Sequence, residues 1–415
     1  MNKIKLRPHN PNYWEWLYSI GKSNEFELSS KDCSGMDLSN YDLADLSFDD
    51  KTIWPTDPSK LPKRFQYKNE VVELGKNPGL GVHQLHTRGI DGNGMRMAII
   101  ESTRLCSHKQ YDENLVHYEE FGFDDNINFG DMHATTVASI ATGKTVGVAP
   151  KAQLYFFATN SFFDGSKERK PPIADNVAAA LERIIEINST LPDNEKIQVV
   201  SMSWGGQMQP QTPGHEKWVI ALEKAKKAGL FVLTTSSNQE NGLRFVGTAC
   251  DMLQDPDLSS GRQAPRWWCN DILKREQENP QGKIMPPMDH RTVASPVSEN
   301  SYTHYGNKTT GMSWATPWLA GMFVLARQVD PTVTPEHFWE VALKTGVLNK
   351  EVGGSIIQPV KLIETLEKER TQALGKQKGK TDAPKKRTKT KGLPAFQKAV
   401  ILQNQKLAER KGIKK

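Results

Sequence analysis

The sequence predicts an α/β fold in which a doubly wound, mostly parallel sheet carries helices on both faces. Four short apolar runs indicate buried strands, and two amphipathic helical patterns separate the last three of them. Alternation of strands with helices is typical of parallel sheets, because a crossover helix returns the chain to the end of the sheet where the next strand begins. A chain of 415 residues is long enough to bury such a core.

The predicted strands are continuous apolar runs. They cover Met95–Ile100, Gln153–Ala158, Gln198–Met202 and Leu230–Thr235. Between the second and third of these runs, Asp175 can cap a helix that places Leu181 and Ile184 on one face. Another helix is predicted over Val219–Ala228, and Gly229 ends it.

The composition excludes several classes of protein. Hydrophobic residues make up 37% and charged residues 25% of the chain, which excludes a wholly disordered chain, a collagen-like chain and a multi-spanning membrane protein. The four cysteines show neither zinc-site spacing nor a dense disulfide framework, and allow at most one bridge, between Cys250 and Cys269. The N-terminus lacks the apolar run of a signal peptide. We therefore expect a cytoplasmic protein with no membrane association.

The N-terminal part of the chain differs from the part that follows it. Residues 1–80 form an arm in which Leu38 and Leu43 begin an apolar pattern with a period of five residues. The patch resembles about one turn of a pentapeptide-repeat coil, which is too short to bury a core alone. We expect the arm to dock on the main domain, residues 81–365. A folding helper or an inhibitory extension could also occupy this position.

Residues 366–415 form a strongly basic tail. From Lys368 to Lys415 the chain has 16 Lys or Arg and 3 acidic residues, and so a net charge of +13. The whole chain has +6, so the preceding residues carry −7. We expect a largely disordered tail that either keeps the protein in solution or binds an acidic partner or nucleic acid by counterion release. No aromatic residues alternate with the lysines, so no sequence-reading module is predicted.

Candidate catalytic side chains are expected at the carboxyl ends of the strands, where functional groups gather in such sheets. Glu101 ends the first strand, and a carboxylate that leaves a buried strand needs a partner. His133 begins a helical pattern of small residues, and the positive end of that helix favours a neutral imidazole that can accept a proton. Either a ring nitrogen of His133 or a basic side chain is the expected partner of Glu101.

Two further side chains suit acyl-transfer chemistry. Ser313 lies near the start of a helix, after Gly311 and before Pro317 in the predicted first turn. The positive helix end would favour an attacking alkoxide, although a simple N-cap serine fits the same place. Asn238 follows the strand Leu230–Thr235, where its amide could donate to an oxyanion or could occupy a turn.

The motifs around these residues resemble those of the subtilisin-like serine protease (subtilase) family. His-Ala-Thr-Thr-Val-Ala-Ser at 133–139 is similar to its His-Gly-Thr-His-Val-Ala-Gly motif. Gly-Met-Ser-Trp-Ala-Thr-Pro at 311–317 is similar to its Gly-Thr-Ser-Met-Ala-Ser-Pro motif. Ser-Met-Ser-Trp-Gly-Gly at 201–206 resembles the strand that pairs with substrate. The order acid, histidine, asparagine, serine is also the family's, and the resemblance covers roughly residues 85–350.

The resemblance implies a subtilisin-like fold and a serine endopeptidase that hydrolyses a protein or peptide substrate. Ser313 would be the nucleophile, His133 the general base and then acid, and Glu101 the residue that holds the histidine tautomer. Asn238 and the backbone N–H of Ser313 would bind the oxyanion. An extended substrate would pair with three residues of the cleft, Ser203, Trp204 and Gly205.

The sequence departs from the family at the acid, which is normally aspartate and here is Glu101. The additional methylene moves the carboxylate by ~1.5 Å, one carbon–carbon bond, although other serine hydrolases use glutamate. Two functions follow: an active serine endopeptidase, or a catalytically inactive subtilase fold that binds peptides or regulates another protein. No cofactor is implied. Members of the family often hold structural calcium, but no clear calcium loop stands out in this sequence.

Overall fold

The computed structural model describes most of the chain. The described residues are 4–21, 24–123, 128–160, 174–203, 210–235, 244–263, 282–349 and 354–381. The chain divides into two compact units, Met1–Lys368 and Glu369–Lys415. All the strands named below belong to the first unit.

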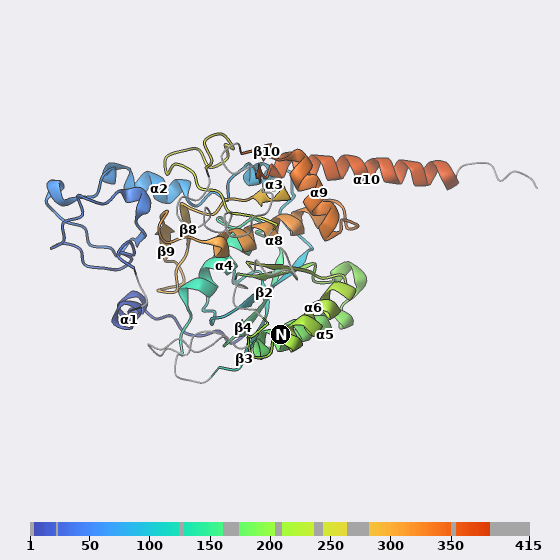
Figure 1. The fold of residues 1–415 in the computed structure, drawn as a ribbon, viewed down its shortest axis with the longest axis horizontal. Coiled ribbons are helices and arrows are strands. Elements are labelled where there is room, and N and C mark those ends of the chain that lie inside the picture. The colour runs from blue at the N-terminus through green and yellow to red at the C-terminus, as the bar shows by residue number, and fades with distance from the viewer. Residues whose placement is uncertain are drawn as a thin grey trace, which may run out of the picture. The chain divides into compact units, whose positions relative to one another are not determined.

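The centre of the first unit is a five-stranded sheet in the order β3-β4-β2-β5-β6, in which every neighbouring pair is parallel (Figure 1). Its strands are β2 (Arg96–Glu101), β3 (Leu115–Phe121), β4 (Gln153–Thr159), β5 (Val199–Met202) and β6 (Phe231–Thr234). The sheet confirms the predicted α/β class and the four predicted strands. The sequence analysis missed β3, because this partly exposed edge strand carries charged residues and has no continuous apolar run.

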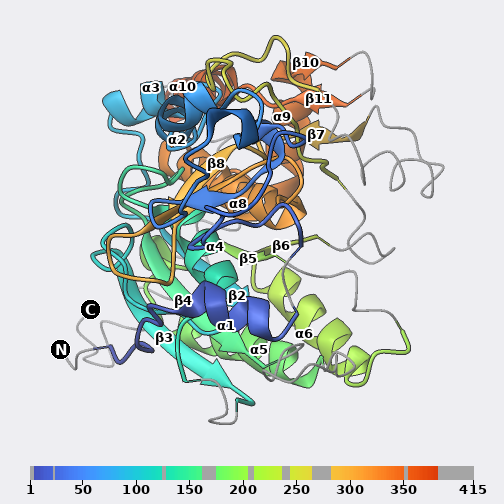
Figure 2. The ribbon, with the colours of Figure 1, turned by 90° about the vertical axis from the view of Figure 1, so that its left-hand side faces the viewer.

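Helices cover both faces of this sheet (Figure 2). Met97 and Ile99 of β2 pack into the core that holds α4 (Met132–Thr142) and α8 (Met312–Val329). Their neighbours in β2 face the opposite core, which holds α5 (Asp175–Thr190) and α6 (His215–Lys227). Alternate residues of a strand point to opposite faces, so β2 is buried on both. The doubly wound arrangement is therefore confirmed.

The helix boundaries differ slightly from the predicted ones. Asp175 is the first residue of α5 rather than its cap, because Ala174 occupies the N-cap position. Helix α6 starts four residues earlier than predicted, at His215, and is followed by Gly229 with φ +75°. Pro317 lies in the interior of α8 rather than in its first turn, since the helix already begins at Met312.

The N-terminal arm contains a coil with a five-residue period. Backbone N–H groups of successive turns reach carbonyls about 20 residues further along: Leu28 to Ser47, Cys33 to Ile53, Leu38 to Lys60 and Leu43 to Lys63, at 2.8–3.0 Å. The side chains of Leu28, Cys33, Leu38 and Leu43 fill its interior and are at most 1% exposed. The apolar period thus starts ten residues before Leu38.

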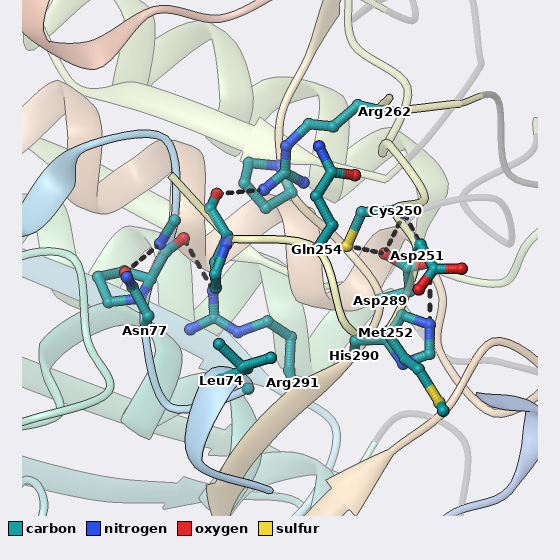
Figure 3. Close-up of a pocket in the computed structure, with 15 residues that line it drawn as sticks. Leu74, Asn77, Cys250, Asp251, Met252, Gln254, Arg262, Asp289, His290 and Arg291 are labelled. Carbon is teal, nitrogen blue, oxygen red and sulfur yellow. Dashed lines mark hydrogen bonds and ion pairs between the residues drawn. The ribbon is translucent and has the colours of Figure 1, made fainter. Parts of the chain in front are cut away.

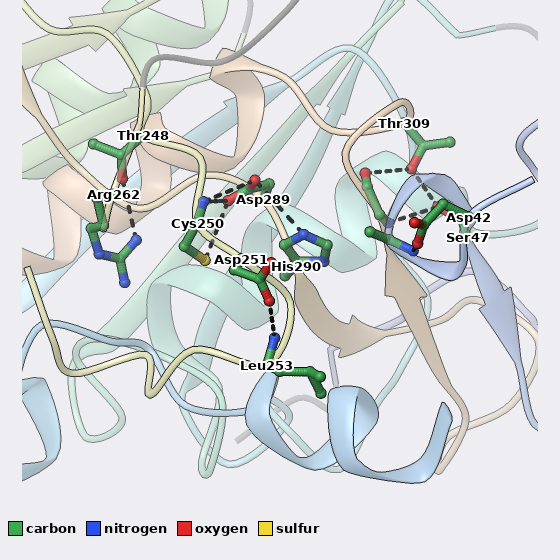
Figure 4. Close-up of polar contacts among 12 residues, drawn as sticks. Asp42, Ser47, Thr248, Cys250, Asp251, Leu253, Arg262, Asp289, His290 and Thr309 are labelled. Carbon is green, nitrogen blue, oxygen red and sulfur yellow. Dashed lines mark hydrogen bonds and ion pairs between the residues drawn. The ribbon is translucent and has the colours of Figure 1, made fainter. Parts of the chain in front are cut away.

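The coil is joined to the rest of the first unit by backbone pairing. Strand β1 (Phe48–Asp49) pairs antiparallel with β9 (Tyr302–Tyr305), which pairs with β8 (Arg291–Ala294). The hydroxyls of Ser47 and Thr309 also contact each other (Figure 4). A Cβ atom on Gly306 would lie 2.5 Å from the Leu46 carbonyl oxygen, so this close approach requires glycine.

Several further helices, strands and turns complete the described part of the chain. The helices are α1 (Tyr13–Ser19), α2 (Lys68–Leu74), α3 (Val82–Thr87), α9 (Pro335–Thr345) and α10 (Pro359–Thr381). A small sheet has the order β10-β11-β7, from Val347–Leu348, Ser355–Ile356 and Ile284–Met285. Short 3₁₀ turns lie at Leu43–Asp45, Pro58–Lys60, Phe65–Tyr67 and Asp193–Glu195. Within the described ranges, no helix combines the length and apolar character needed to cross a membrane.

Candidate active site

Glu101 and His133 lie in contact at the carboxyl end of β2. The Glu101 side chain is fully buried, and the backbone N–H and hydroxyl of Ser102 donate to its Oε1 at 2.6 and 2.8 Å. Its other oxygen, Oε2, lies 3.0 Å from Nδ1 of His133 in an ion-pair contact that is not aligned as a hydrogen bond. Glutamate therefore reaches the histidine despite its extra methylene, and the hydrogen bonds from Ser102 hold its other carboxylate oxygen in place.

The start of α4 holds His133 from a second direction. Asp131 is the N-cap residue of this helix, and its Oδ1 accepts a hydrogen bond from the His133 backbone N–H at 2.8 Å. The Tyr13 hydroxyl of α1 donates to Oδ2 of the same carboxylate at 2.8 Å. The His133 side chain remains 24% exposed. The imidazole is thus anchored at its backbone and at Nδ1, yet open to solvent.

The charges around His133 set its protonation. Burial alone would lower the pKa of His133, but the carboxylates of Glu101 and Asp131 outweigh burial and raise it above its usual value. The helix start was expected to favour the neutral ring, and this expectation is wrong in direction. Two nearby carboxylates have a stronger effect than the partial positive charge of a helix end.

Ser313 is bonded reciprocally to Ser203. The Ser313 hydroxyl donates to the Ser203 carbonyl at 2.9 Å, and the Ser203 hydroxyl donates to the Ser313 carbonyl at 2.8 Å. In a regular helix that second carbonyl would accept from the N–H four residues on, but residue 317 is proline and has no N–H. Pro317 therefore leaves the Ser313 carbonyl available, and the end of β5 is tied to the start of α8.

Trp314 follows Ser313 directly in the chain, and its ring contacts the ring of His133. Its ring lies 5.4 Å from the His133 ring, edge to face. Ser313 and His133 share no hydrogen bond in this part of the structure, because the serine hydroxyl points to Ser203. The structure thus joins Glu101 to His133 and Ser203 to Ser313, and the Trp314 ring contacts the histidine of the first pair.

Three of the predicted site residues are not part of the structural description. Trp204 and Gly205 of the predicted substrate strand, and Asn238 of the predicted oxyanion site, lie outside the described residues. Conversely, the sequence analysis missed Tyr13, and it gave Asp131 no role once Glu101 was chosen as the acid. Asp131 has the signal of an N-cap two residues before the histidine. Tyr13 belongs to a different element, so no sequence pattern near His133 could have indicated that it takes part in the site.

A second group of titratable side chains surrounds Cys250 and Asp289 (Figures 3 and 4). The Cys250 backbone N–H lies 3.2 Å from both Asp289 carboxylate oxygens. Burial raises the pKa of Asp289 to about 7, and burial together with that carboxyl raises the pKa of the free Cys250 thiol to about 12. The thiol therefore stays protonated and is a poor nucleophile. Its predicted bridge partner, Cys269, lies outside the described residues.

The arginines beside this group have structural contacts. Arg291, which is fully buried, donates to the carbonyls of Pro78 and Val146 at 2.9 Å, and Arg262 donates to that of Pro256 at 2.6 Å. The Arg291 bonds thus connect the loops that contain Pro78 and Val146, and the Arg262 bond stays within its own loop. In the described ranges, no three or more His, Cys, Asp or Glu side chains are arranged to hold a metal ion. The expectation of a structural calcium ion is not tested by this observation.

A parallel α/β sheet with a buried acid, a histidine that is 24% exposed and a serine at one end is the architecture of a class of serine peptidases. A sequence model of the subtilase family matches residues 75–263. This match, together with the relatives described next, identifies the chain as a subtilisin-like serine peptidase. The resemblance inferred from the motifs is thereby confirmed.

Two curated proteases are similar to this chain. One is the thermostable alkaline protease of Halalkalibacterium halodurans, which is 24% identical over 282 residues, 64% of this chain and 67% of the relative. The other is the serine protease AprX of Bacillus subtilis, which is 25% identical over 289 residues, 62% of each chain. The chain thus spans less than two thirds of the length of AprX.

Solved structures of similar fold include fervidolysin from Fervidobacterium pennivorans, a keratinolytic enzyme related to subtilisin. Its TM-score is 0.48 and its sequence identity is 15%. The superposition covers 72% of this chain and 46% of the fervidolysin chain. The prenylagaramide maturation protease PagA has a TM-score of 0.46 and a sequence identity of 14%. The superposition covers 69% of this chain and 98% of the PagA chain.

Proposed function

We propose that this chain is a serine endopeptidase that cleaves peptide bonds with Ser313, His133 and Glu101. The observation that carries the proposal is the 3.0 Å contact between Oε2 of the buried Glu101 and Nδ1 of His133. A buried carboxylate beside Nδ1 favours the tautomer that carries its hydrogen on Nδ1 and leaves Nε2 to accept a proton, and it stabilises the imidazolium that then forms. The raised pKa of His133 is the equilibrium signature of the same stabilisation.

The reaction begins when the Ser313 hydroxyl leaves the Ser203 carbonyl. Rotation about one staggered side-chain torsion redirects the hydroxyl, and catalytic hydrogen bonds often tighten only when substrate binds. The Ser313 oxygen attacks the peptide carbonyl while His133 takes its proton, and His133 then protonates the leaving amine. The acyl-enzyme is hydrolysed by water, with His133 again as the base.

The remaining roles follow from the motifs and stay predictions. Asn238 and the backbone N–H of Ser313 would stabilise the oxyanion of the tetrahedral intermediate. The substrate backbone would pair with the residues Ser203, Trp204 and Gly205 as an added strand. Ser203 would then bind the substrate and would also hold the Ser313 hydroxyl in its resting position, because its carbonyl accepts a hydrogen bond from that hydroxyl.

Labelling with a fluorophosphonate probe tests the proposal. Wild type is expected to form one adduct at Ser313, which mass spectrometry locates, and Ser313→Ala is expected to form none. Ser34→Ala, at an exposed serine of the arm, is the matched control and should label like wild type. A folded wild-type protein that does not label, or that labels at another serine, would contradict the proposal.

A second function is favoured by one observation, the hydrogen bond of the Ser313 hydroxyl to the Ser203 carbonyl instead of to His133. If that bond were permanent, the fold would bind peptides without cleaving them, as a binding or regulatory module. This alternative predicts that a casein-derived peptide mixture binds equally to wild type and Ser313→Ala, and that neither protein releases fragments.

Three expectations from the sequence stay predictions. The basic tail, of which residues 382–415 lie outside the described residues, would bind an acidic partner or nucleic acid. Its deletion should then remove any salt-dependent binding. A cytoplasmic location and a structural calcium ion remain equally open to test.

A further inference from the structure

The beginning of the N-terminal arm pairs with the loop that follows β2, the strand that ends with the proposed acid. The Arg7 backbone N–H donates to the Leu105 carbonyl at 3.1 Å, and Arg7 and Cys106 form a parallel bridge. Two residues further along the arm, the His9 ring donates from Nε2 to the Ser107 carbonyl at 2.7 Å. The arm therefore runs beside this loop as an additional extended segment.

The same stretch of the arm also contacts the residues that lead into α4, the helix that carries the proposed base. The Gly130 backbone N–H donates to the Pro8 carbonyl at 3.0 Å. The next N–H, that of Asp131, donates to the Arg104 carbonyl at 2.9 Å, so the two loops also contact each other directly. Residues 7–13 are thus bonded both to the loop after the acid and to the residues before the histidine.

A cluster of two arginines and one carboxylate anchors this segment to the edge strand β3. Arg7 donates from Nε and Nη2 to the two oxygens of Glu120 at 2.7 and 2.6 Å, and Arg104 donates to the same carboxylate at 3.0 Å. Burial would raise the pKa of Glu120, but the bonds from Arg7 and Tyr118 and the charge of Arg104 outweigh burial and lower it. The two-point arginine contact has a defined geometry, so it fixes where the segment lies.

Tyr13 ends this segment and contacts the proposed base only through another residue. It is fully buried, so it cannot touch a substrate. Its hydroxyl donates to Oδ2 of Asp131, and Oδ1 of that carboxylate accepts the His133 backbone N–H, each at 2.8 Å. A carboxylate that is held at both oxygens cannot rotate freely, and it fixes the first turn of α4. The hydroxyl of Tyr13 thereby restrains the backbone from which the imidazole extends.

We propose that residues 7–13 are a permanent part of the catalytic machinery, with Tyr13 as the positioning residue for His133. The inference deepens the function proposed above and rests on it. A shift of ~1 Å in a catalytic group can cost about 10²-fold in rate, so a remote bond that fixes the histidine affects turnover. The arm is then required for turnover, whereas an inhibitory extension would block it.

Steady-state kinetics of full-length variants test this proposal with a chromogenic peptide anilide, for which acylation limits turnover. Tyr13→Phe keeps the ring and removes only the hydroxyl. We expect kcat to fall about 3- to 10-fold, as for the loss of one hydrogen bond, with KM unchanged because the buried ring does not touch the substrate. The matched control is Tyr18→Phe in the same helix, which removes a bond to the Ser29 carbonyl and should keep the wild-type kcat.

A second background separates positioning from a general loss of stability. In Asp131→Asn the amide oxygen still accepts the His133 N–H, and the amide nitrogen that replaces the other oxygen cannot accept the Tyr13 hydroxyl. Adding Tyr13→Phe to this variant should therefore lower kcat by less than about twofold. The same fold-loss in kcat in both backgrounds would overturn the claim that Tyr13 acts through Asp131.

The possible outcomes separate this inference from the proposed function. Intact mass measured during the assay should show that the uncut chain cleaves the anilide. Cleavage that begins only after the arm is lost, or equal kcat for wild type and Tyr13→Phe, would overturn the inference while the catalytic proposal stands. If neither form cleaves the anilide, the catalytic proposal fails. Hydrogen exchange of the His133 amide then decides: faster exchange in Tyr13→Phe than in Tyr18→Phe supports the positioning role, and equal exchange overturns it.

Discussion

The hydroxyl of Tyr13 donates a hydrogen bond to Oδ2 of Asp131 across 2.8 Å, and so connects the N-terminal arm to the N-cap of α4. Both residues are fixed by burial or by a second bond, since Tyr13 is fully buried and Asp131 also accepts from the His133 N–H. A residue near the beginning of the chain therefore supports the position of the histidine.

Replacing Tyr13 by Phe should destabilise the protein without removing apolar surface. The Asp131 oxygen would lose its donor, and an unsatisfied buried acceptor costs ~1–3 kcal/mol. Urea unfolding followed by tryptophan fluorescence measures this loss. Tyr41→Phe, in which an exposed and long contact to Glu25 is lost, is the control and should unfold like wild type. Equal midpoints for the two variants would show that the Tyr13 bond contributes nothing.

Neutralising Asp131 should shift the pH dependence of activity. Asp131→Asn keeps an acceptor for the His133 N–H but removes a charge that raises the pKa of His133. The base form of the histidine would then persist to lower pH, so the acid limb of the kcat/KM profile should move down by several tenths of a pH unit. Asp32→Asn, in the exposed coil, should leave the limb unchanged. An upward movement of the limb for Asp131→Asn would contradict the electrostatic role.

Replacing the acid tests the role of Glu101 separately. Glu101→Gln retains the size of the side chain but leaves no charge to stabilise the imidazolium, and we expect kcat/KM to fall ~10²-fold or more. Glu101→Asp shortens the side chain and should retain more activity than Glu101→Gln, although less than wild type, because the 3.0 Å contact with His133 is stretched. A Glu101→Gln variant as active as wild type would show that another group serves as the acid.

Pro317 and Ser203 should show coupled effects on stability. Ser203→Ala removes the donor to the Ser313 carbonyl and should cost ~1 kcal/mol or more. In the Pro317→Ala background, residue 317 regains an N–H that can satisfy this carbonyl, so the same substitution should cost clearly less. Urea unfolding of wild type, both single variants and the double variant gives this coupling. If the two losses of stability were strictly additive, Ser203 and residue 317 would not share the Ser313 carbonyl as their acceptor.

Asp289 should make stability decrease as the pH rises toward neutrality. Burial raises its pKa to about 7, so between pH 4 and 7 the folded state keeps a proton that the unfolded state has released. Unfolding is then favoured by rising pH across this window, by a few kcal/mol at most. Asp289→Asn should flatten that part of the stability profile. Unchanged slopes between pH 4 and 7 would show that Asp289 ionises normally in the folded protein.

Much of the fold could be predicted from the sequence because its core strands are continuous apolar runs. The edge strand β3 could not, since half-exposed strands lack that signal. The coil was recognised only from Leu38 onward, because Cys33 interrupts the run of leucines that marks its interior. Local patterns thus find elements that are uniformly buried and miss those whose burial depends on a neighbour.

The candidate site could likewise be predicted only where the signal lies within one element. Glu101 and His133 were placed together because each ends or begins an element at the same end of the sheet. The bond between Ser313 and Ser203 could not be predicted, since it depends on the distance between two elements 110 residues apart. The direction of the His133 pKa was predicted wrongly because Asp131 and Glu101 act together through space.

The pairing of β1 with β9 has a consequence for how proteolytic processing would appear in an experiment. A cut in the connection between the coil and α2 would leave the first fragment hydrogen-bonded to the second through Phe48 and His304. Denaturing electrophoresis would then display two pieces, while sedimentation in native buffer would report a single particle of unchanged mass. A nicked sample of this protein would thus remain a complete, two-chain enzyme.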